Sequence, residues 1–273
     1  MSSKEQIIEV ESLPVDIQTG ATYAIKQANP NSYTHGMFKY PCKFIPEIPR
    51  WGIKTYLSEK RGVIFDPFSG SGTTLLEANV NGLDAYGTEI DDIAKLIIKV
   101  KTTVLDSAQM KLLDQCYSEI INIIGQDDVK LFTPAIVNLE HWFSENTINE
   151  LGRIKAYIDN IEDEDVRDFF KLCMASIIKK VSNADDTSPK PYVSNKIIKV
   201  PPTVEKEFTS VFRRYKQMMQ ELTHVKKMGN TVIIQGDALE FSVPLGIDLA
   251  ITSPPYINAF DYGRTMRLEN LWL

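Results

Sequence analysis

The stretch Val63-Ile64-Phe65-Asp66-Pro67-Phe68-Ser69-Gly70-Ser71-Gly72-Thr73-Thr74 decides the fold of this chain. A short apolar run ends in an acid, a turn rich in glycine and serine follows, and a helical pattern then runs to Asn81-Gly82. This order predicts a strand, a tight loop and a helix. Gly70 and Gly72 permit positive φ and let the backbone approach a ligand closely. The helix after them begins with free N–H groups.

Two nucleotide-binding motifs come close to this stretch and fail. A P-loop would need a lysine directly after its second glycine, and Thr73 follows Gly72. A dinucleotide fingerprint would need a third glycine where Leu75 stands. The acid at the strand end suits a ligand that carries an amino acid as well as a nucleoside. The simplest alternative is an ordinary strand-to-helix turn that binds nothing.

Two motifs together give the chain a family resemblance. Asp66 to Thr74 resembles the cofactor motif of the AdoMet-dependent amino-methyltransferases of DNA, the N4-cytosine and N6-adenine group, and Ser253-Pro254-Pro255-Tyr256 resembles their catalytic motif. The resemblance implies an α/β fold with the Rossmann-like sheet of the class I methyltransferases. It also implies S-adenosyl-L-methionine (AdoMet) as the cofactor and DNA as a partner.

The expected cofactor site draws on several parts of the chain. Glu89 ends a second predicted strand about twenty residues past the glycine loop, where a carboxylate can accept hydrogen bonds from a ribose. By resemblance, Lys43 and Phe44 lie in a segment that closes over the methionine end of the cofactor, and Asp237 and Ala238 contact its adenine. The full predicted set is Lys43, Phe44, Asp66, Pro67, Phe68, Gly70, Gly72, Thr73, Glu89, Ile90, Asp237 and Ala238.

The catalytic prediction rests on what an exocyclic base amine needs. Its lone pair is delocalised into the ring, so acceptors must orient its hydrogens. Ser253 and the carbonyl of Pro254 can be those acceptors, Pro255 stiffens the turn, and Tyr256 can stack on a base flipped out of the duplex. Serine at the first position favours cytosine N4, whereas Asp or Asn would favour adenine N6 or guanine N2.

Composition limits the classes of protein to which this chain can belong. The chain has 273 residues and a net charge of −6, which argues against a protein that coats nucleic acid generally but leaves room for a local basic face. Its three cysteines show no metal-binding spacing, so we expect reduced thiols, no metal and a cytoplasmic location. No apolar run approaches the length of a membrane span, and we expect no membrane contact.

Three regions are expected along the chain. Residues 1–104 would hold a loose lead-in with one short strand and the cofactor-binding half, and residues 229–273 the third and fourth strands with the catalytic loop. Residues 105–228 read as a helical insertion with a polar loop at 182–196 and many lysines and arginines after it. That insertion is the candidate target-recognition region. The alternative is a plain surface loop followed by a basic amphipathic helix.

The resembled fold has seven strands, and the chain to Leu273 accounts for about the first four. We therefore expect a second polypeptide or a second copy to complete the sheet, or else a truncated or split enzyme. The predicted function is that of a site-specific, restriction-type DNA (cytosine-N4)-methyltransferase or its AdoMet-binding subunit. The alternatives are an adenine-N6 DNA enzyme, an RNA amino-methyltransferase, and an inactive fragment that only binds AdoMet or DNA.

Overall fold

The structure is a computed structural model that describes residues 7–26, 29–57, 61–126, 131–135, 137–196, 198–234, 238, 240, 242, 246–254 and 261–273. Its central feature is a sheet of four parallel strands in the order β5-β4-β3-β6. The strands are β3 (Val63–Asp66), β4 (Asp84–Thr88), β5 (Thr231–Ile234) and β6 (Leu249–Ala250). Helices accompany the sheet, which confirms the predicted α/β class.

The glycine loop lies where the sequence predicts it. β3 has a buried apolar interior, and α2 (Thr73–Val80) begins directly after Gly72, whose φ of +73° lies in the left-handed region that favours glycine. A Cβ on Gly72 would also meet Ile98 on α3 (Asp92–Thr102) at 2.9 Å. The loop is therefore pressed closely against α3, and Gly72 allows this approach.

The remaining strands show two departures from the predictions. The run 247–252, which ends at the Ser-Pro-Pro-Tyr motif, predicts the fourth strand, yet only Leu249–Ala250 has strand geometry. Asp248 and Ile251 still donate backbone hydrogen bonds to β3 on either side of it. The described part of the lead-in is not loose. It holds β1 (Ile7–Val10), which confirms the one short strand predicted there, and a second strand that was not predicted, β2 (Thr22–Ile25), which pairs with β1 in parallel.

The region between β4 and β5 is helical, as predicted. After α3 it contains α4 (Ser107–Ile124), α5 (Leu139–Trp142), α6 (Glu145–Ile158), α7 (Glu164–Val181) and α8 (Val204–Thr223). Each of the four long helices has a polar residue at its N-cap; Asp163, for example, accepts a hydrogen bond from the N–H of Val166 at the start of α7.

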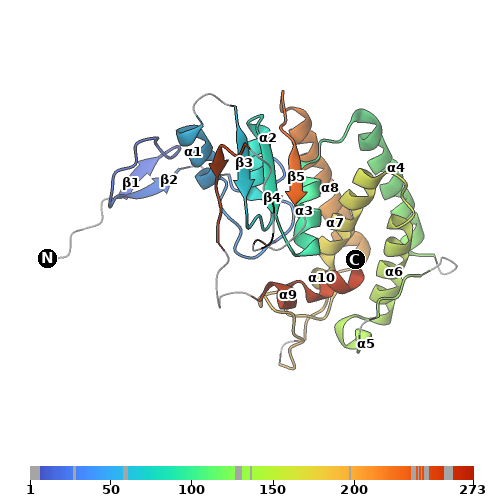
Figure 1. The fold of residues 1–273 in the computed structure, drawn as a ribbon. Coiled ribbons are helices and arrows are strands. Elements are labelled where there is room, and N and C mark those ends of the chain that lie inside the picture. Colours follow the sequence, from blue (N-terminus) through green and yellow to red (C-terminus); the bar gives the residue numbers. More distant parts are fainter. Residues whose placement is uncertain are drawn as a thin grey trace.

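These helices share one hydrophobic core with the cofactor half. The core joins α4, α6, α7 and α8 to α3, to Met37 and Phe38 of the N-terminal segment, and to α10 (Arg267–Trp272) near the C-terminal end. Figure 1 shows the sheet between the small β1–β2 pair and the outer helices α4 and α6. The helices α1 (Glu47–Tyr56) and α9 (Tyr262–Thr265) complete the described fold. The three predicted region boundaries stay a prediction.

Two further observations concern the class of protein. Cys42, Cys116 and Cys173 are free thiols. Among the described residues, no helix combines the length and the apolar character that crossing a bilayer requires.

Candidate active site

A cavity of about 490 Å³ lies at the carboxyl ends of β3, β4 and β6. In parallel sheets of this kind, ligands bind in the crevice outside those strand ends. The glycine loop forms one wall, and the N-terminal segment around Lys43 forms another. The lining residues are Tyr40, Cys42, Lys43, Phe44, Asp66, Pro67, Phe68, Ser69, Gly70, Ser71, Thr73, Thr74, Thr88, Glu89, Ile90, Asp91, Ala238, Ser253, Pro254 and Gly263.

Glu89 is held in place by backbone groups. Its Oε2 accepts a hydrogen bond from the N–H of Gly70 at 2.9 Å, and its Oε1 accepts from Ile90 and Asp91 at 2.8 and 2.9 Å. Burial raises the pKa of this carboxyl, while the N–H donors oppose the rise. A carboxylate has about four acceptor positions, and three are used here. A ribose that offers two hydroxyls would therefore compete with one backbone bond.

Asp66 connects the two predicted motifs. Its Oδ1 accepts hydrogen bonds from the hydroxyl of Thr252 at 2.7 Å and from the N–H of Phe68 at 3.1 Å. Burial raises the pKa of Asp66, and these donors together with Thr74 oppose the rise. Since Thr252 directly precedes Ser253, this contact fixes the start of the Ser-Pro-Pro-Tyr motif beside the cofactor motif.

A buried lysine supports the glycine loop from behind. Lys101 on α3 is completely buried, and its Nζ donates a hydrogen bond to the carbonyl of Ser71 at 2.6 Å. Burial lowers the pKa of Lys101 well below its usual value. The hydroxyl of Thr34 donates to the main-chain carbonyl of Lys101 at 2.7 Å. The loop is thus linked through α3 to the N-terminal segment.

An ion cluster lies under the helix that follows the loop. Glu77 on α2 is fully buried and accepts two hydrogen bonds from Arg50, at 2.7 and 3.0 Å. The Nε2 of His35 lies 2.9 Å from the same carboxylate. Burial lowers the pKa of His35 to about 4. His35 is therefore a buried structural partner of Glu77.

The N-terminal wall of the cavity is pinned to the helical region. Phe38 and Cys42 both have positive φ, a strained conformation for residues other than glycine. The N–H of Phe38 donates to the hydroxyl of Tyr215 on α8 at 2.7 Å, and Tyr215 is fully buried. Burial also lowers the pKa of Lys43, which lines the cavity, to about 8.

The structure thus brings most of the predicted site residues to one cavity. Of the predicted cofactor residues, Gly72 is not in the wall, and Asp237 lies outside the described residues. Of the catalytic motif, Ser253 and Pro254 line the cavity, and Pro255 and Tyr256 lie outside the described residues. The sequence analysis missed Thr252, Lys101 and Tyr215. Of these three, only Lys101 gives a signal in the sequence, because it stands four residues after Ile97 and eight after Ile93, at the spacing of a buried helix face.

Comparison with known proteins agrees with this picture. Residues 2–100 match a family model described as DNA methylase, the N6/N4 methyltransferase family. The type II methyltransferase M.MvaI of Kocuria varians is 29% identical over 266 residues, which cover 90% of this chain and 58% of the relative. The type II methyltransferase M.BsoBI of Geobacillus stearothermophilus is 27% identical over 276 residues, covering 90% of this chain and 54% of the relative.

A third relative matches a shorter part. The type II methyltransferase M.MjaII of Methanocaldococcus jannaschii is 33% identical over 100 residues, which cover 35% of this chain and 19% of the relative. No solved structure matches the chain. The chain spans a little over half the length of the first two relatives. These matches confirm the predicted cofactor, AdoMet, and confirm that this chain resembles the AdoMet-dependent DNA amino-methyltransferases of the N4/N6 group.

Proposed function

We propose that this chain is a site-specific DNA methyltransferase, or its AdoMet-binding part, and that its target is the N4 amine of a flipped cytosine. One observation carries the proposal. The glycine loop, Glu89 and Ser253 line the same cavity, although 164 residues separate Glu89 from Ser253 along the chain. A cofactor motif and a base-binding motif that share a cavity can serve a transfer between two ligands.

The described residues fit AdoMet. The cavity combines apolar walls such as Phe44 and Phe68 with the carboxylates of Asp66 and Glu89, and binding sites for small organic ligands have this mixed character. Glu89 would accept from the ribose, and the buried carboxylate of Asp66 would lie toward the amino-acid end. When bound, AdoMet supplies an activated methyl group on a sulfonium. The protein's task is then chiefly to position the acceptor.

Ser253 and Pro254 would provide that positioning. The serine hydroxyl and the proline carbonyl are acceptors that can take the two hydrogens of an exocyclic amine, and Asp66 holds this segment through Thr252. A base inside a duplex cannot reach the cavity, so it must be flipped out. Tyr256 would stack on the flipped ring. Serine at position 253 supports cytosine as the target.

The architecture supports the same proposal. If β3, β4, β5 and β6 are renumbered 1 to 4 in chain order, they lie side by side in the order 3-2-1-4, which is the order of the first four strands of a Rossmann-like sheet. Among the described residues, β6 pairs with β3 alone, so its other edge is open. We propose that a further segment, on a second polypeptide or a second copy, pairs with this edge. We also propose that the helical region 105–228 serves target recognition.

The proposal is tested by AdoMet binding and methyl transfer together. Isothermal calorimetry should show AdoMet binding that Glu89→Ala weakens, because the substitution removes the ribose acceptor and the partner of the Gly70 N–H. Tritium from labelled AdoMet should enter duplex DNA. If AdoMet binds and no tritium enters DNA of any sequence, the chain is the inactive binding fragment. If tritium enters RNA in preference to DNA, the RNA alternative replaces the proposal.

A further inference from the structure

Two apolar side chains are unusually exposed. Ile198 and Val200 are 89% and 88% exposed, the highest values among the large hydrophobic residues that the structure describes. Both lie in the connection between α7 and α8, after the polar loop. Singly exposed apolar residues are common, but two so close together and so fully exposed suggest contact with a partner.

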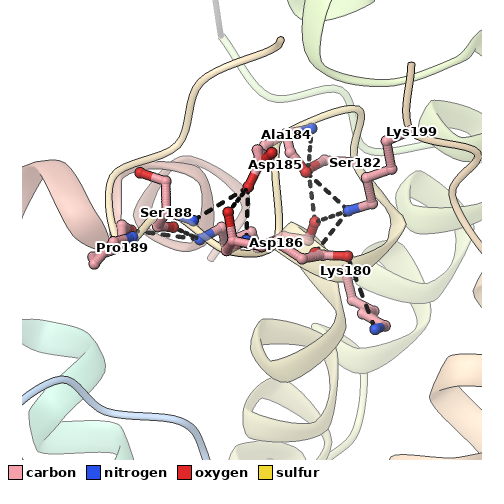
Figure 2. Close-up of polar contacts among 10 residues, drawn as sticks. Lys180, Ser182, Ala184, Asp185, Asp186, Ser188, Pro189 and Lys199 are labelled. Atoms are coloured by element: carbon pink, nitrogen blue, oxygen red, sulfur yellow. Dashed lines mark hydrogen bonds and ion pairs between the residues drawn. The ribbon is translucent and has the colours of Figure 1, made fainter. Parts of the chain in front are cut away.

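The residue between them is firmly anchored. The Nζ of Lys199 donates hydrogen bonds to the carbonyls of Ala184 and Lys179, at 2.9 and 3.2 Å, and to Asp186 at 2.8 Å. Figure 2 shows Lys199 reaching into the turn formed by residues 182–186. Three acceptors satisfy all three ammonium hydrogens. In an extended chain, side chains alternate in direction, so anchoring Lys199 inward turns Ile198 and Val200 outward.

The segment is stiff and its surroundings are basic. Pro201 and Pro202 follow directly and limit backbone freedom. From 179 to 200 the sequence has five lysines and two aspartates. Asp186 is paired with Lys199 and Lys180, and Asp185 accepts hydrogen bonds from the N–H groups of Thr187 and Ser188, as Figure 2 shows for part of this network. Both acids are engaged within the loop, and so are Lys179 and Lys199, which donate hydrogen bonds to loop carbonyls. Lys190 and Lys196 are exposed and add positive charge on the same loop as the apolar pair.

The segment begins after α7, a helix that packs against α10. Burial lowers the pKa of Lys179, and the charges of Glu269 on α10 and of Lys39 also act on that pKa. Lys39 precedes Tyr40, which lines the cavity, and α10 packs on α7 a short distance along the chain from Ser253. The loop therefore starts from a helix that packs against α10, an element that follows the catalytic motif along the chain.

We propose that Ile198 and Val200 are a DNA-contacting apolar pair that inserts into the base stack next to the flipped base. The inference rests on the proposed function. Flipping a base leaves a gap in the duplex, and apolar side chains from other DNA-binding proteins fill or wedge open such steps. The neighbouring lysines would contact phosphates and hold the pair at the duplex. Lys199 positions the pair from within the protein and does not contact DNA.

The first test detects contact between the apolar pair and DNA, and it does not require methyl transfer. A photo-crosslinking amino acid, p-benzoylphenylalanine, replaces Ile198 in one variant and Ile7 in a control. Ile7 is also exposed but lies on β1, at the left of Figure 1 and away from the connection between α7 and α8. Irradiation with fluorescent duplex DNA should give a crosslinked protein–DNA band from position 198 and none from position 7. A crosslink from position 198 to a second copy of the chain, with none to DNA, overturns the proposal.

The second test separates insertion from simple attraction. The double variant Ile198→Ser/Val200→Ser should fold normally, because both side chains are exposed. We expect it to bind AdoMet as the wild type does and to show a roughly ten-fold lower kcat/KM for duplex DNA, equivalent to about 1.4 kcal/mol. Ile7→Ser should leave kcat/KM unchanged. If the wild type methylates DNA and the double variant does so equally well, the inference fails while the proposed function stands. If the wild type neither crosslinks to nor methylates DNA, both fail.

Discussion

Replacing Lys101 by methionine should weaken cofactor binding without unfolding the protein. Lys101 is completely buried, and its Nζ donates a hydrogen bond to the carbonyl of Ser71 in the glycine loop. Methionine has a similar length and no charge. The substitution removes the cost of burying an ammonium group, which affects folding stability. It also removes the hydrogen bond that holds the glycine loop, which affects cofactor binding.

The expected size follows from these two effects. Replacing a buried charge by an apolar group of similar volume is often neutral or stabilising, so the free energy of unfolding should stay within about 1–2 kcal/mol of the wild type. Leaving the Ser71 carbonyl without its partner costs about 1–3 kcal/mol. AdoMet binding must then restore the ordered conformation of the glycine loop at this same cost, so the Kd for AdoMet should rise by roughly 5- to 150-fold.

Calorimetry with AdoMet and urea unfolding measure the two quantities separately. Lys95→Met is the matched control, because Lys95 lies on the same helix and pairs with Asp92 at the surface. It should change neither quantity. The reasoning is refuted if Lys101→Met binds AdoMet like the wild type. It is refuted equally if the loss of affinity comes with a comparable loss of folding stability, because Lys101 would then be a general structural residue.

Three further substitutions test the buried polar groups. The pKa of His35 is about 4 in the folded protein and 6.5 in the unfolded chain, so the unfolded chain takes up the proton first and folding stability is lost as pH falls from about 6.5 to 4. Between pH 7 and pH 5, urea unfolding should therefore show a loss of stability that is about 2 kcal/mol smaller in His35→Gln than in the wild type. Burial raises the pKa of Glu269 to about 7, so its protonated form favours folding and stability is lost as pH rises from about 4.5 through 7. Glu269→Gln should therefore be about 3 kcal/mol more stable than the wild type at pH 8 and differ by less than about 1 kcal/mol at pH 5, and an equal gain at both pH values would show that its charge is irrelevant. Tyr215→Phe leaves the buried N–H of Phe38 without its partner, and thermal or urea unfolding should record a loss of about 1–3 kcal/mol; no loss would mean that water replaces the hydroxyl.

The sequence was most informative where local chemistry decides the structure. The glycine loop, the strand before it and the acid at position 89 were predictable because glycine conformation and apolar runs act over a few residues. The helical nature of residues 105–228 was predictable for the same reason. The two-residue length of β6 was not predictable, because the neighbouring strand, and not the run 247–251 itself, decides how far the pairing extends.

Long-range contacts were beyond sequence reasoning. The hydroxyl of Tyr215 accepts a hydrogen bond from the N–H of Phe38, 177 positions away in the sequence. The hydroxyl of Thr252 donates one to Asp66, 186 positions away. Neither residue stands out in its own neighbourhood. The buried pairing of His35 with Glu77 is equally invisible, because nothing near His35 in the sequence indicates Glu77 or Arg50 as partners. Tertiary packing supplies those partners, and only the fold reveals them.

Nucleoside mass spectrometry of DNA from cells that produce this chain tests the central claim most directly. The account predicts N4-methylcytosine in the digested DNA, and its loss when Ser253 is replaced by alanine in a chain that still binds AdoMet. Serine's hydroxyl is the proposed acceptor for the target amine, so the methyl group should disappear with it. N4-methylcytosine that persists at full level in the Ser253→Ala sample, or a methyl group found only on cytosine C5, would contradict the account.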